Sequence, residues 1–302
     1  MFKNKYIYLA LLSNVFAGIN VTLNKYLVQE VGTSYASYLF GYRHIIMAFI
    51  LYISYKVRKK CNQMGTTEVS DNQGIDQHKS IQLSVIFHTI NIGFIEVLLF
   101  RYLNNYALSI IPTNLAGVIE LTEGFFVIVL YILLGHKVVG MRKSIIYYTS
   151  GVLLILVSNG LFYSSLKGVV FALLSIFLLA IADVYTKWLH QKYDADLVFV
   201  KVIHHLAGGI MLLIFNINHP ASSLSLKALV VLGILILSSF ALTYLYAISL
   251  EHISAYEASL SDISLTLVTT LTGVLLFSEL PSIWTIISCI LIYLALVVAP
   301  RE

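Results

Sequence analysis

The sequence predicts an all-α integral membrane protein with ten transmembrane helices arranged as two inverted five-helix repeats. Three observations support this prediction: the composition, a series of apolar runs and an internal repeat. Of the 302 residues, 59% are hydrophobic and only 11% are charged, whereas soluble domains average about 45 to 50% and 25%. Such a chain is expected to lie in the lipid bilayer. Its net charge of +4 is spread over several loops, so nucleic acid is not an expected partner.

Apolar runs of about 20 residues predict the ten spans in order along the chain. They cover roughly residues 6–28, 35–55, 81–103, 108–134, 144–162, 168–189, 197–215, 226–249, 253–277 and 282–299. The first run is too long for a removable signal peptide and lacks a convincing cleavage site, so we expect it to be retained. The long polar insertion at residues 56–80 is rich in Asn, Gln, Gly, Asp and Lys, which predicts a flexible cytoplasmic loop.

The distribution of Lys and Arg predicts the orientation. If the N-terminus is cytoplasmic, thirteen of these residues fall in inner segments, and the outer segments hold only Lys25, Arg101, Lys167 and Lys227. The positive-inside rule therefore places both termini in the cytoplasm, which agrees with an even number of spans. We expect the bacterial cytoplasmic (inner) membrane. The two cysteines, in a polar loop and in an apolar run, indicate neither a disulfide framework nor a metal site.

An internal repeat divides the chain into residues 1–162 and 163–302. The tetrapeptide Ala-Leu-Leu-Ser of residues 10–13 recurs at residues 172–175, and the same offset of 162 aligns Arg43 with His205. Tyr-Ala-Leu at residues 106–108 then matches Tyr-Ala-Ile at residues 246–248, and a small gap brings Glu120 opposite Asp262. Five spans in each half would invert the second half. Many secondary transporters have this plan, with the substrate site near the membrane midplane.

Two acidic residues lie near the middle of the fourth predicted span. Glu120 and Glu123 are three residues apart and share one helix face. A carboxylate at this depth costs about 2.5 to 3.5 kcal/mol unless it is paired, hydrated or protonated. Because like charges this close disfavour double ionisation, one of the two is expected to hold a proton. Close helix packing would explain Gly117 and Gly124, but it does not explain two acids, which indicate a path for a solute, an ion or protons.

Other polar residues are expected to complete a substrate or proton site. They are Asp262 and Glu96 as further acids, Arg43 as a carboxylate or structural partner, Asn20, His88 and Asn91 as polar lining, His204 and His205 as proton relays or satisfied interior donors, and Tyr185 and Tyr244 as aromatic walls. Asp183 and Lys187 are four residues apart and are expected to pair with each other. No metal site is expected, because adjacent histidines on a helix point about 100° apart and no zinc-type spacing accompanies them.

A charge count narrows the class of substrate. Near the midplane, Glu96, Glu120, Glu123 and Asp262 exceed the cations Arg43 and Lys201 by two charges. Protons on the carboxylates, protonated histidines or a cationic substrate group must neutralise this excess. An amino-acid-like zwitterion or an organic cation therefore fits better than an anion or a sugar.

Three short motifs accompany the five-plus-five arrangement. Arg43 lies in Tyr-Arg-His on the second span, residues 106–108 read Tyr-Ala-Leu after the third, and residues 276–280 read Leu-Phe-Ser-Glu-Leu at the end of the ninth. With these features the chain resembles the drug/metabolite transporter superfamily, of the EamA type. It departs from the family at residues 135–137, Gly-His-Lys in place of Gly-Glu, and at the two acids of the fourth span. The resemblance implies a small-molecule permease, in a family whose substrates include drugs, amino acids, nucleotide-like compounds and sugars.

The expected function is secondary-active transport of a small polar metabolite by alternating access, with proton coupling as an open option. No P-loop pattern occurs, so we expect no nucleotide-driven step, no cofactor and no catalytic residue. An intramembrane enzyme using the same carboxylates and histidines and a channel are the alternatives. The substrate, the direction of transport, the coupling ion and the choice between monomer and homodimer stay open.

Overall fold

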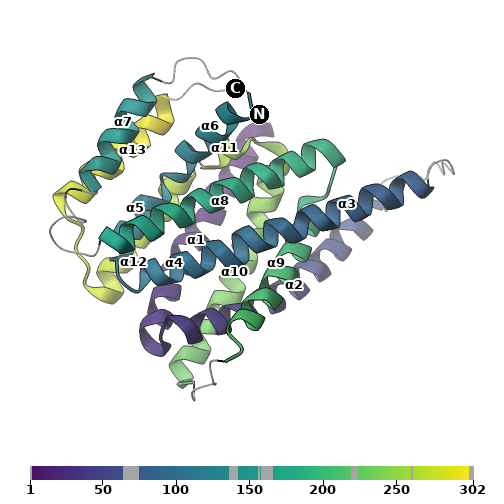
Figure 1. The fold of residues 1–302 in the computed structure, drawn as a ribbon, viewed down its shortest axis with the longest axis horizontal. Coiled ribbons are helices and arrows are strands. Elements are labelled where there is room, and N and C mark those ends of the chain that lie inside the picture. The colour runs from purple at the N-terminus through teal and green to yellow at the C-terminus, as the bar shows by residue number, and fades with distance from the viewer. Residues whose placement is uncertain are drawn as a thin grey trace.

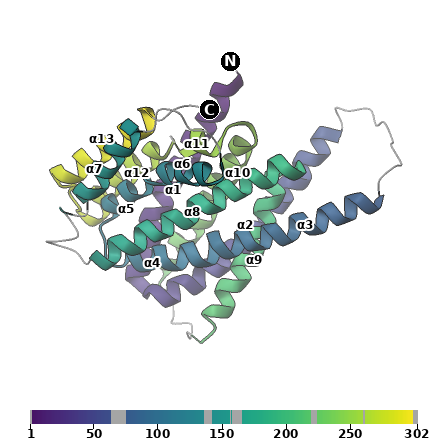
Figure 2. The ribbon, with the colours of Figure 1, turned by 45° about the horizontal axis from the view of Figure 1, so that its top comes forward.

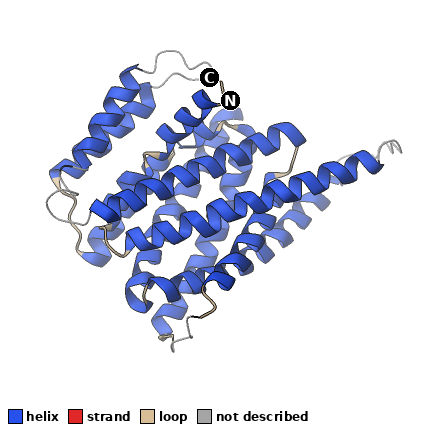
Figure 3. Ribbon diagram, in the orientation of Figure 1, coloured by secondary structure: helices blue, strands red, loops and turns tan. Residues whose placement is uncertain are grey.

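The computed structural model describes residues 2–63, 75–135, 142–155, 157, 166–218, 224–259 and 261–298. These residues form helices and short connections, without a strand among them (Figure 3). Eight helical runs in this part of the chain are long and apolar enough to cross a membrane. Two shorter apolar helices, Ile145–Leu154 and Ile283–Ala295, coincide with the other two predicted spans. The expectation of an all-helical, multi-pass membrane protein is therefore confirmed.

The first half of the chain begins with two long helices. Its elements are α1 (Phe2–Val31), α2 (Thr33–Gln63), α3 (Ile75–Gly93), the π-helix η1 (Phe94–Phe100), α4 (Arg101–Leu108), α5 (Thr113–Glu120), α6 (Glu123–Leu133) and α7 (Arg142–Ile155). Both α2 and α3 extend into the segment predicted as a loop, residues 56–80, because its Lys, Arg and Gln are good helix formers. That prediction is wrong at both ends of the segment, and residues 64–74 lie outside the described residues.

The second half starts with three long helices and ends with three shorter ones. They are α8 (Leu166–Tyr193), α9 (Leu197–Phe215), α10 (Leu226–His252), α11 (Ala255–Ser259), α12 (Asp262–Phe277) and α13 (Ile283–Val298). Side-chain caps fix two of the starts. Asp196 accepts a hydrogen bond from the backbone N–H of Phe199 at the start of α9, and Ser225 does the same for Ala228 at the start of α10.

The helices pack in pairs that join the two halves. Helix α1 lies along α10 and α12, and α8 lies along the α3–η1–α4 run and α6 (Figures 1 and 2). Helix α2 packs on α9, α5 on α12 and α7 on α13, the last pair at the left edge of Figure 1. Apolar side chains such as Leu226 and Leu275 are 78% and 70% exposed, whereas Arg43 and Asp262 are buried. This distribution suits a bundle with lipid outside and polar groups inside.

The fourth predicted span, residues 108–134, is not one helix. Helix α4 ends at Leu108, α5 starts after Pro112, and a turn at Leu121 and Thr122 separates α5 from α6. At this turn the Thr122 hydroxyl donates to the carbonyl of Ile119 at 2.6 Å, a bond that competes with regular helix bonding. The ninth predicted span has the same break, where the Ser261 hydroxyl donates to the carbonyl of Ala258. The prediction of continuous helices is wrong at both places.

Candidate functional site

A cavity of about 100 Å³ lies among the helices where the two halves meet. Helices α1, α2, α4, α5, α6, α8, α9, α10 and α12 and the π-helix η1 all contribute to its wall. Its polar lining consists of Asn14, Asn20, His44, Glu96, Arg101, Glu120, Glu123, Asp183, Lys201, His205, Ser239, Thr243, Tyr246 and Asp262. Ionisable residues inside a membrane protein usually serve a solute or an ion, so this cavity is the candidate site.

One wall of the cavity is acidic. Glu123 and Asp183 lie close enough for their carboxyl groups to interact. Asp183 also accepts a hydrogen bond from the Tyr246 hydroxyl. Asn14 donates to Asp262 Oδ1 at 2.8 Å, while Asp262 Oδ2 is buried and has no partner among the described residues. The acidic wall therefore keeps an acceptor oxygen free.

Glu123 and Asp262 occupy equivalent positions at the starts of the two broken helices. Each is the first residue of its helix and follows a residue with nearly the same backbone angles, φ −73° and ψ −10° at Thr122, φ −75° and ψ −9° at Ser261. The free N–H groups at a helix start favour negative charge. The sequence repeat aligns Asp262 with Glu120, but the helix breaks align it with Glu123 instead.

A further part of the cavity wall carries the cations Lys201 and Arg101. Lys201 on α9 forms an ion pair with Glu96 on η1 at 2.9 Å, and Arg101 at the start of α4 lies close enough to interact electrostatically with Glu96 and Glu120. π-Helical turns often occur at functional sites, and here η1 places both Glu96 and, one residue beyond its end, Arg101 at the cavity. His44 and His205 complete this wall.

Glycine allows the broken helices to cross closely. A Cβ atom on Gly117 of α5 would lie 1.9 Å from Thr269 Oγ1 of α12. At the same crossing the Thr266 hydroxyl donates to the Gly117 carbonyl at 2.7 Å. This contact fixes α5 against α12, and so it fixes Glu120 and Asp262 at the cavity.

Six of the residues predicted for the site line the cavity: Asn20, Glu96, Glu120, Glu123, His205 and Asp262. Two more lie directly behind the wall, since His204 is hydrogen-bonded to His205 and Arg43 to His44. Of the two roles predicted for Arg43, the structure supports the structural one. Its Nη1 donates to Asn24 Oδ1 at 2.7 Å, and the hydrogen bonds found for it in the described part of the chain involve no carboxylate.

Four predicted residues lie away from the cavity. His88 and Asn91 contact the hydroxyl of Tyr185, at 2.5 Å for His88 Nδ1, in an aromatic cluster with Trp188. Tyr244 stacks on Phe240. Tyr185 is two positions after the lining residue Asp183, and Tyr244 is two positions before the lining residue Tyr246. Two positions along a helix change the direction of a side chain by about 200°. The two tyrosines, predicted as cavity walls, are therefore not among the residues that line this cavity.

Eight of the polar lining residues were not predicted as part of the site: Asn14, His44, Arg101, Asp183, Lys201, Ser239, Thr243 and Tyr246. A signal existed for Asp183 and Asn14, which are polar and central in their apolar runs. Arg101 was expected in an outer segment, but the α3–η1–α4 run continues to Leu108 and holds Arg101 within the span. Lys25, also expected outside, is buried and paired with Glu279.

The predicted pair of Asp183 and Lys187 is also wrong. Asp183 accepts a hydrogen bond from Tyr246, whereas the ammonium group of Lys187 donates to the backbone carbonyl of Leu250 at 2.6 Å. The last carbonyl groups of a helix have no partner within it and attract cations. Lys187 therefore caps the end of α10 instead of neutralising the acid one turn away.

Ligand atoms of Glu96, His204 and His205 lie within 4.8 Å of one another, a spacing that could hold a metal ion. The same carboxylate of Glu96 is already bonded to Lys201, and Arg43 and Arg101 lie nearby. A divalent cation would have to displace the ammonium group and bind beside two guanidinium groups. The geometry thus favours the ion pair over a metal site.

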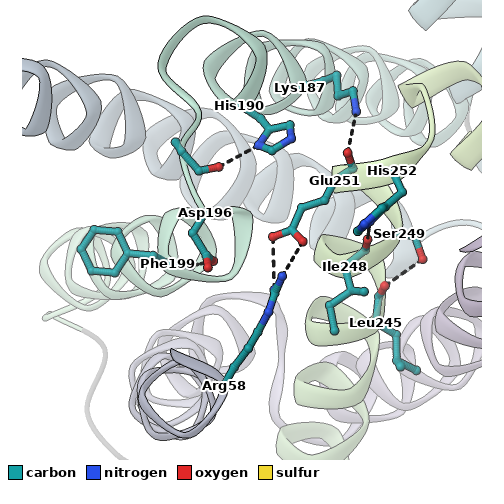
Figure 4. Close-up of polar contacts among 11 residues, drawn as sticks. Arg58, Lys187, His190, Asp196, Phe199, Leu245, Ile248, Ser249, Glu251 and His252 are labelled. Carbon is teal, nitrogen blue, oxygen red and sulfur yellow. Dashed lines mark hydrogen bonds and ion pairs between the residues drawn. The ribbon is translucent and has the colours of Figure 1, made fainter. Parts of the chain in front are cut away.

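Ion pairs lie toward both ends of the bundle. Figure 4 shows Arg58, near the end of α2, bonded to both carboxylate oxygens of Glu251 at 3.2 and 2.7 Å. Lys187 bonds the Leu250 carbonyl beside it. Toward the other end, Lys25 pairs with Glu279, whose second oxygen accepts from the backbone N–H of Thr113 at 2.6 Å. The two ion pairs, Arg58–Glu251 and Lys25–Glu279, each join the first half of the chain to the second.

Comparisons with known proteins relate the second half to a transport family. Residues 166–299 match the family described as "EamA-like transporter family", which confirms the predicted resemblance there. No curated protein matches the chain at a significant level. A solved structure titled "Crystal structure of protein" aligns with 95% of this chain and 95% of its own, with a TM-score of 0.61 and 15% sequence identity. This likeness shows a common fold alone.

Proposed function

Because residues 166–299 carry an EamA-like transporter domain, we propose that the protein is a secondary-active transporter for a small zwitterionic or cationic metabolite. The transported molecule binds in the central cavity, and rocking of residues 1–162 against residues 163–302 exposes it to each side in turn. The observation that carries this proposal is the cavity itself, because both halves line it with charged groups of both signs.

The contacts between helices support two inverted repeats. In the proposed repeat, α1 corresponds to α8, the α3–η1–α4 run corresponds to α10, and α5 and α6 correspond to α11 and α12. Helix α1 packs on α10, and α8 packs on the corresponding α3–η1–α4 run. Likewise, α1 packs on α12, and α8 packs on α5 and α6. Lys25 and Lys187, aligned by the offset of 162, repeat one contact, since each bonds a backbone carbonyl near the end of a helix in its own half. The broken helices before Glu123 and Asp262 repeat as well.

The charges at the cavity support the class of substrate. Five carboxyl groups face Arg101 and Lys201, and Lys201 is occupied by Glu96. An ammonium group would compensate the acidic wall, while a carboxylate on the same molecule would bind Arg101, which offers several N–H donors. A proton held between the neighbouring carboxyl groups of Glu123 and Asp183 would give coupling to a proton gradient a physical basis, because a cation entering the cavity competes with it.

The ion pairs near the two ends support alternating access. With both termini in the cytoplasm, as the positive-inside rule predicts for a bacterial cytoplasmic membrane, Arg58–Glu251 closes the inner side and Lys25–Glu279 the outer side. A cycle requires one pair to open while the other is formed.

Reconstitution into liposomes tests the function. Compounds that raise the melting temperature of the purified protein are taken from a screen of amino acids and organic cations, and the best is assayed for counterflow. A carrier gives saturable counterflow that is lost in D262N and E123Q and kept in the matched surface variant E30Q. Flux that does not saturate would identify a channel instead, and chemical turnover of the compound would identify an enzyme.

A further inference from the structure

Three histidines form a continuous buried chain between α2 and α9. His44 Nδ1 and His205 Nδ1 are 3.1 Å apart, and His205 Nε2 and His204 Nε2 are 3.0 Å apart. The rings of His44 and His205 stack with centroids 5.0 Å apart. His44 and His205 also line the cavity, so the chain has direct access to its contents.

The two ends of the chain fix which nitrogen carries each proton. Arg43 can only donate, and its Nη2 faces His44 Nε2 at 3.3 Å, so that nitrogen accepts and His44 carries its proton on Nδ1. His205 then accepts on Nδ1 and donates from Nε2 to His204. This leaves the His204 proton on Nδ1, which faces the Glu96 carboxylate at 3.6 Å.

This arrangement leaves no place for another proton. Each neutral imidazole carries one N–H proton, and these three protons lie in the contacts His44–His205, His205–His204 and His204–Glu96. The contact between Arg43 and His44 is filled by a proton of Arg43. An added proton makes one histidine a donor at both nitrogens. Wherever it settles along the three rings, two N–H groups then face each other at one contact between Arg43 and His204.

The helices around the three histidines have little room to relieve this repulsion by small shifts. A Cβ on Gly209 of α9 would lie 3.0 Å from the Gly41 carbonyl of α2, and one on Gly93 would lie 2.5 Å from the His204 carbonyl. Glycine thus brings the backbones into contact beside the rings. When the added proton lies on His205, the two facing N–H groups are those of His44 and His205, the contact that joins α2 to α9. Relief of that contact requires α9 to move relative to α2.

We propose that the chain His44–His205–His204 is a proton-binding site, distinct from the acidic wall, whose occupation separates α9 from α2. The proton comes from water in the cavity and binds an imidazole nitrogen, which converts that ring to imidazolium. The inference rests on the proposed transport function only for its role, since α2 and α9 belong to opposite halves. The charged groups around the chain are Arg43, Lys201, Arg101 and Glu96, with Glu120, Glu123, Asp183 and Asp262 across the cavity.

Nitrogen-15 NMR of the imidazoles in the full-length protein tests the site. Signals are assigned with H44Q, H204Q and H205Q. We expect Nδ1–H for His44, Nε2–H for His205 and Nδ1–H for His204 at neutral pH, and a joint change of all three signals on acidification. The opposite order of tautomers, or three independent titrations, would overturn the inference.

A distance measurement tests the movement. Spin labels replace the exposed residues Phe49 of α2 and Ile210 of α9 in a background with C61S and C289S. Acidification is expected to shift the label separation by about 1 to 2 Å or more in the parent and in the exposed control H252Q. No shift is expected in H205Q, because its glutamine can donate a hydrogen bond to His204 without binding a proton. The same shift in H205Q would refute the mechanism. Neither measurement needs a substrate, so absence of transport would count against the proposed function alone.

Discussion

The crossing of α5 and α12 at Gly117 gives the most sharply defined prediction. In G117A the new methyl carbon would lie 1.9 Å from Thr269 Oγ1 and 3.0 Å from Thr269 Cβ. Contacts of Cβ atoms essentially never fall below 3.0 Å, so the helices must separate locally by about 1 Å. Overpacking of this kind costs about 1 to 3 kcal/mol. Separation also lengthens the bond from Thr266 to the Gly117 carbonyl, which adds about 0.6 kcal/mol in a membrane.

Reversible unfolding of the purified protein in lipid nanodiscs measures this cost. We expect G117A to lose about 2 to 4 kcal/mol of unfolding free energy. The double variant G117A/T269A should recover part of the loss, because T269A removes the oxygen at 1.9 Å. The matched control is G233A in α10, where a Cβ meets no atom within 4 Å, and a gain of about 0.5 to 1 kcal/mol is expected there.

Two results would refute this reasoning. If G117A is as stable as the parent, the helices do not cross at the distance described. If T269A leaves the cost of G117A unchanged in the double-mutant cycle, the clash is not with Thr269.

The remaining predictions concern the ion pairs and the acidic wall. K25M leaves the Glu279 carboxylate without its cation and should cost up to about 3 to 5 kcal/mol of unfolding free energy. R58A removes the cation of a more exposed pair and should cost about 0 to 1 kcal/mol. Equal losses for the two variants in the same nanodisc assay would contradict the argument from burial. Y246F removes a hydrogen bond to Asp183 and should cost about 1.5 to 3 kcal/mol if that acid is ionised, or about 0.5 to 1.5 if it is neutral. Two neighbouring carboxylates disfavour double ionisation, so we expect Glu123 and Asp183 to share a proton that D183N makes unnecessary. Calorimetry of the best cationic ligand should then show fewer protons released by D183N than by the parent; an unchanged proton release would place the proton elsewhere.

Much of the fold could be predicted from the sequence because lipid imposes a local requirement. Each span needs about 20 apolar residues with its backbone bonds satisfied inside a helix, and that pattern is visible in one dimension. The same cost makes acids such as Glu120 and Asp262 conspicuous without any knowledge of their partners.

The partners themselves could not be predicted from spacing. Lys187 stands one turn from Asp183 yet caps α10, and Arg101, expected outside, lies at the cavity. Both outcomes depend on where a different helix ends or begins. The break before Glu123 was missed for a related reason, because a threonine hydroxyl can bond its own helix with or without interrupting it.

The sequence by itself therefore determined a helical membrane protein with acidic groups within its spans. The tertiary structure decided which side of each helix faces the cavity, and so it selected Asp183 and Tyr246 while excluding Tyr185 and Tyr244. Rotation about a helix axis is fixed by contacts between distant segments, such as Gly117 against Thr269 and Gly41 against Gly209. Successive residues of a helix point about 100° apart, and the sequence pattern of a single apolar helix does not show how that helix is rotated about its axis.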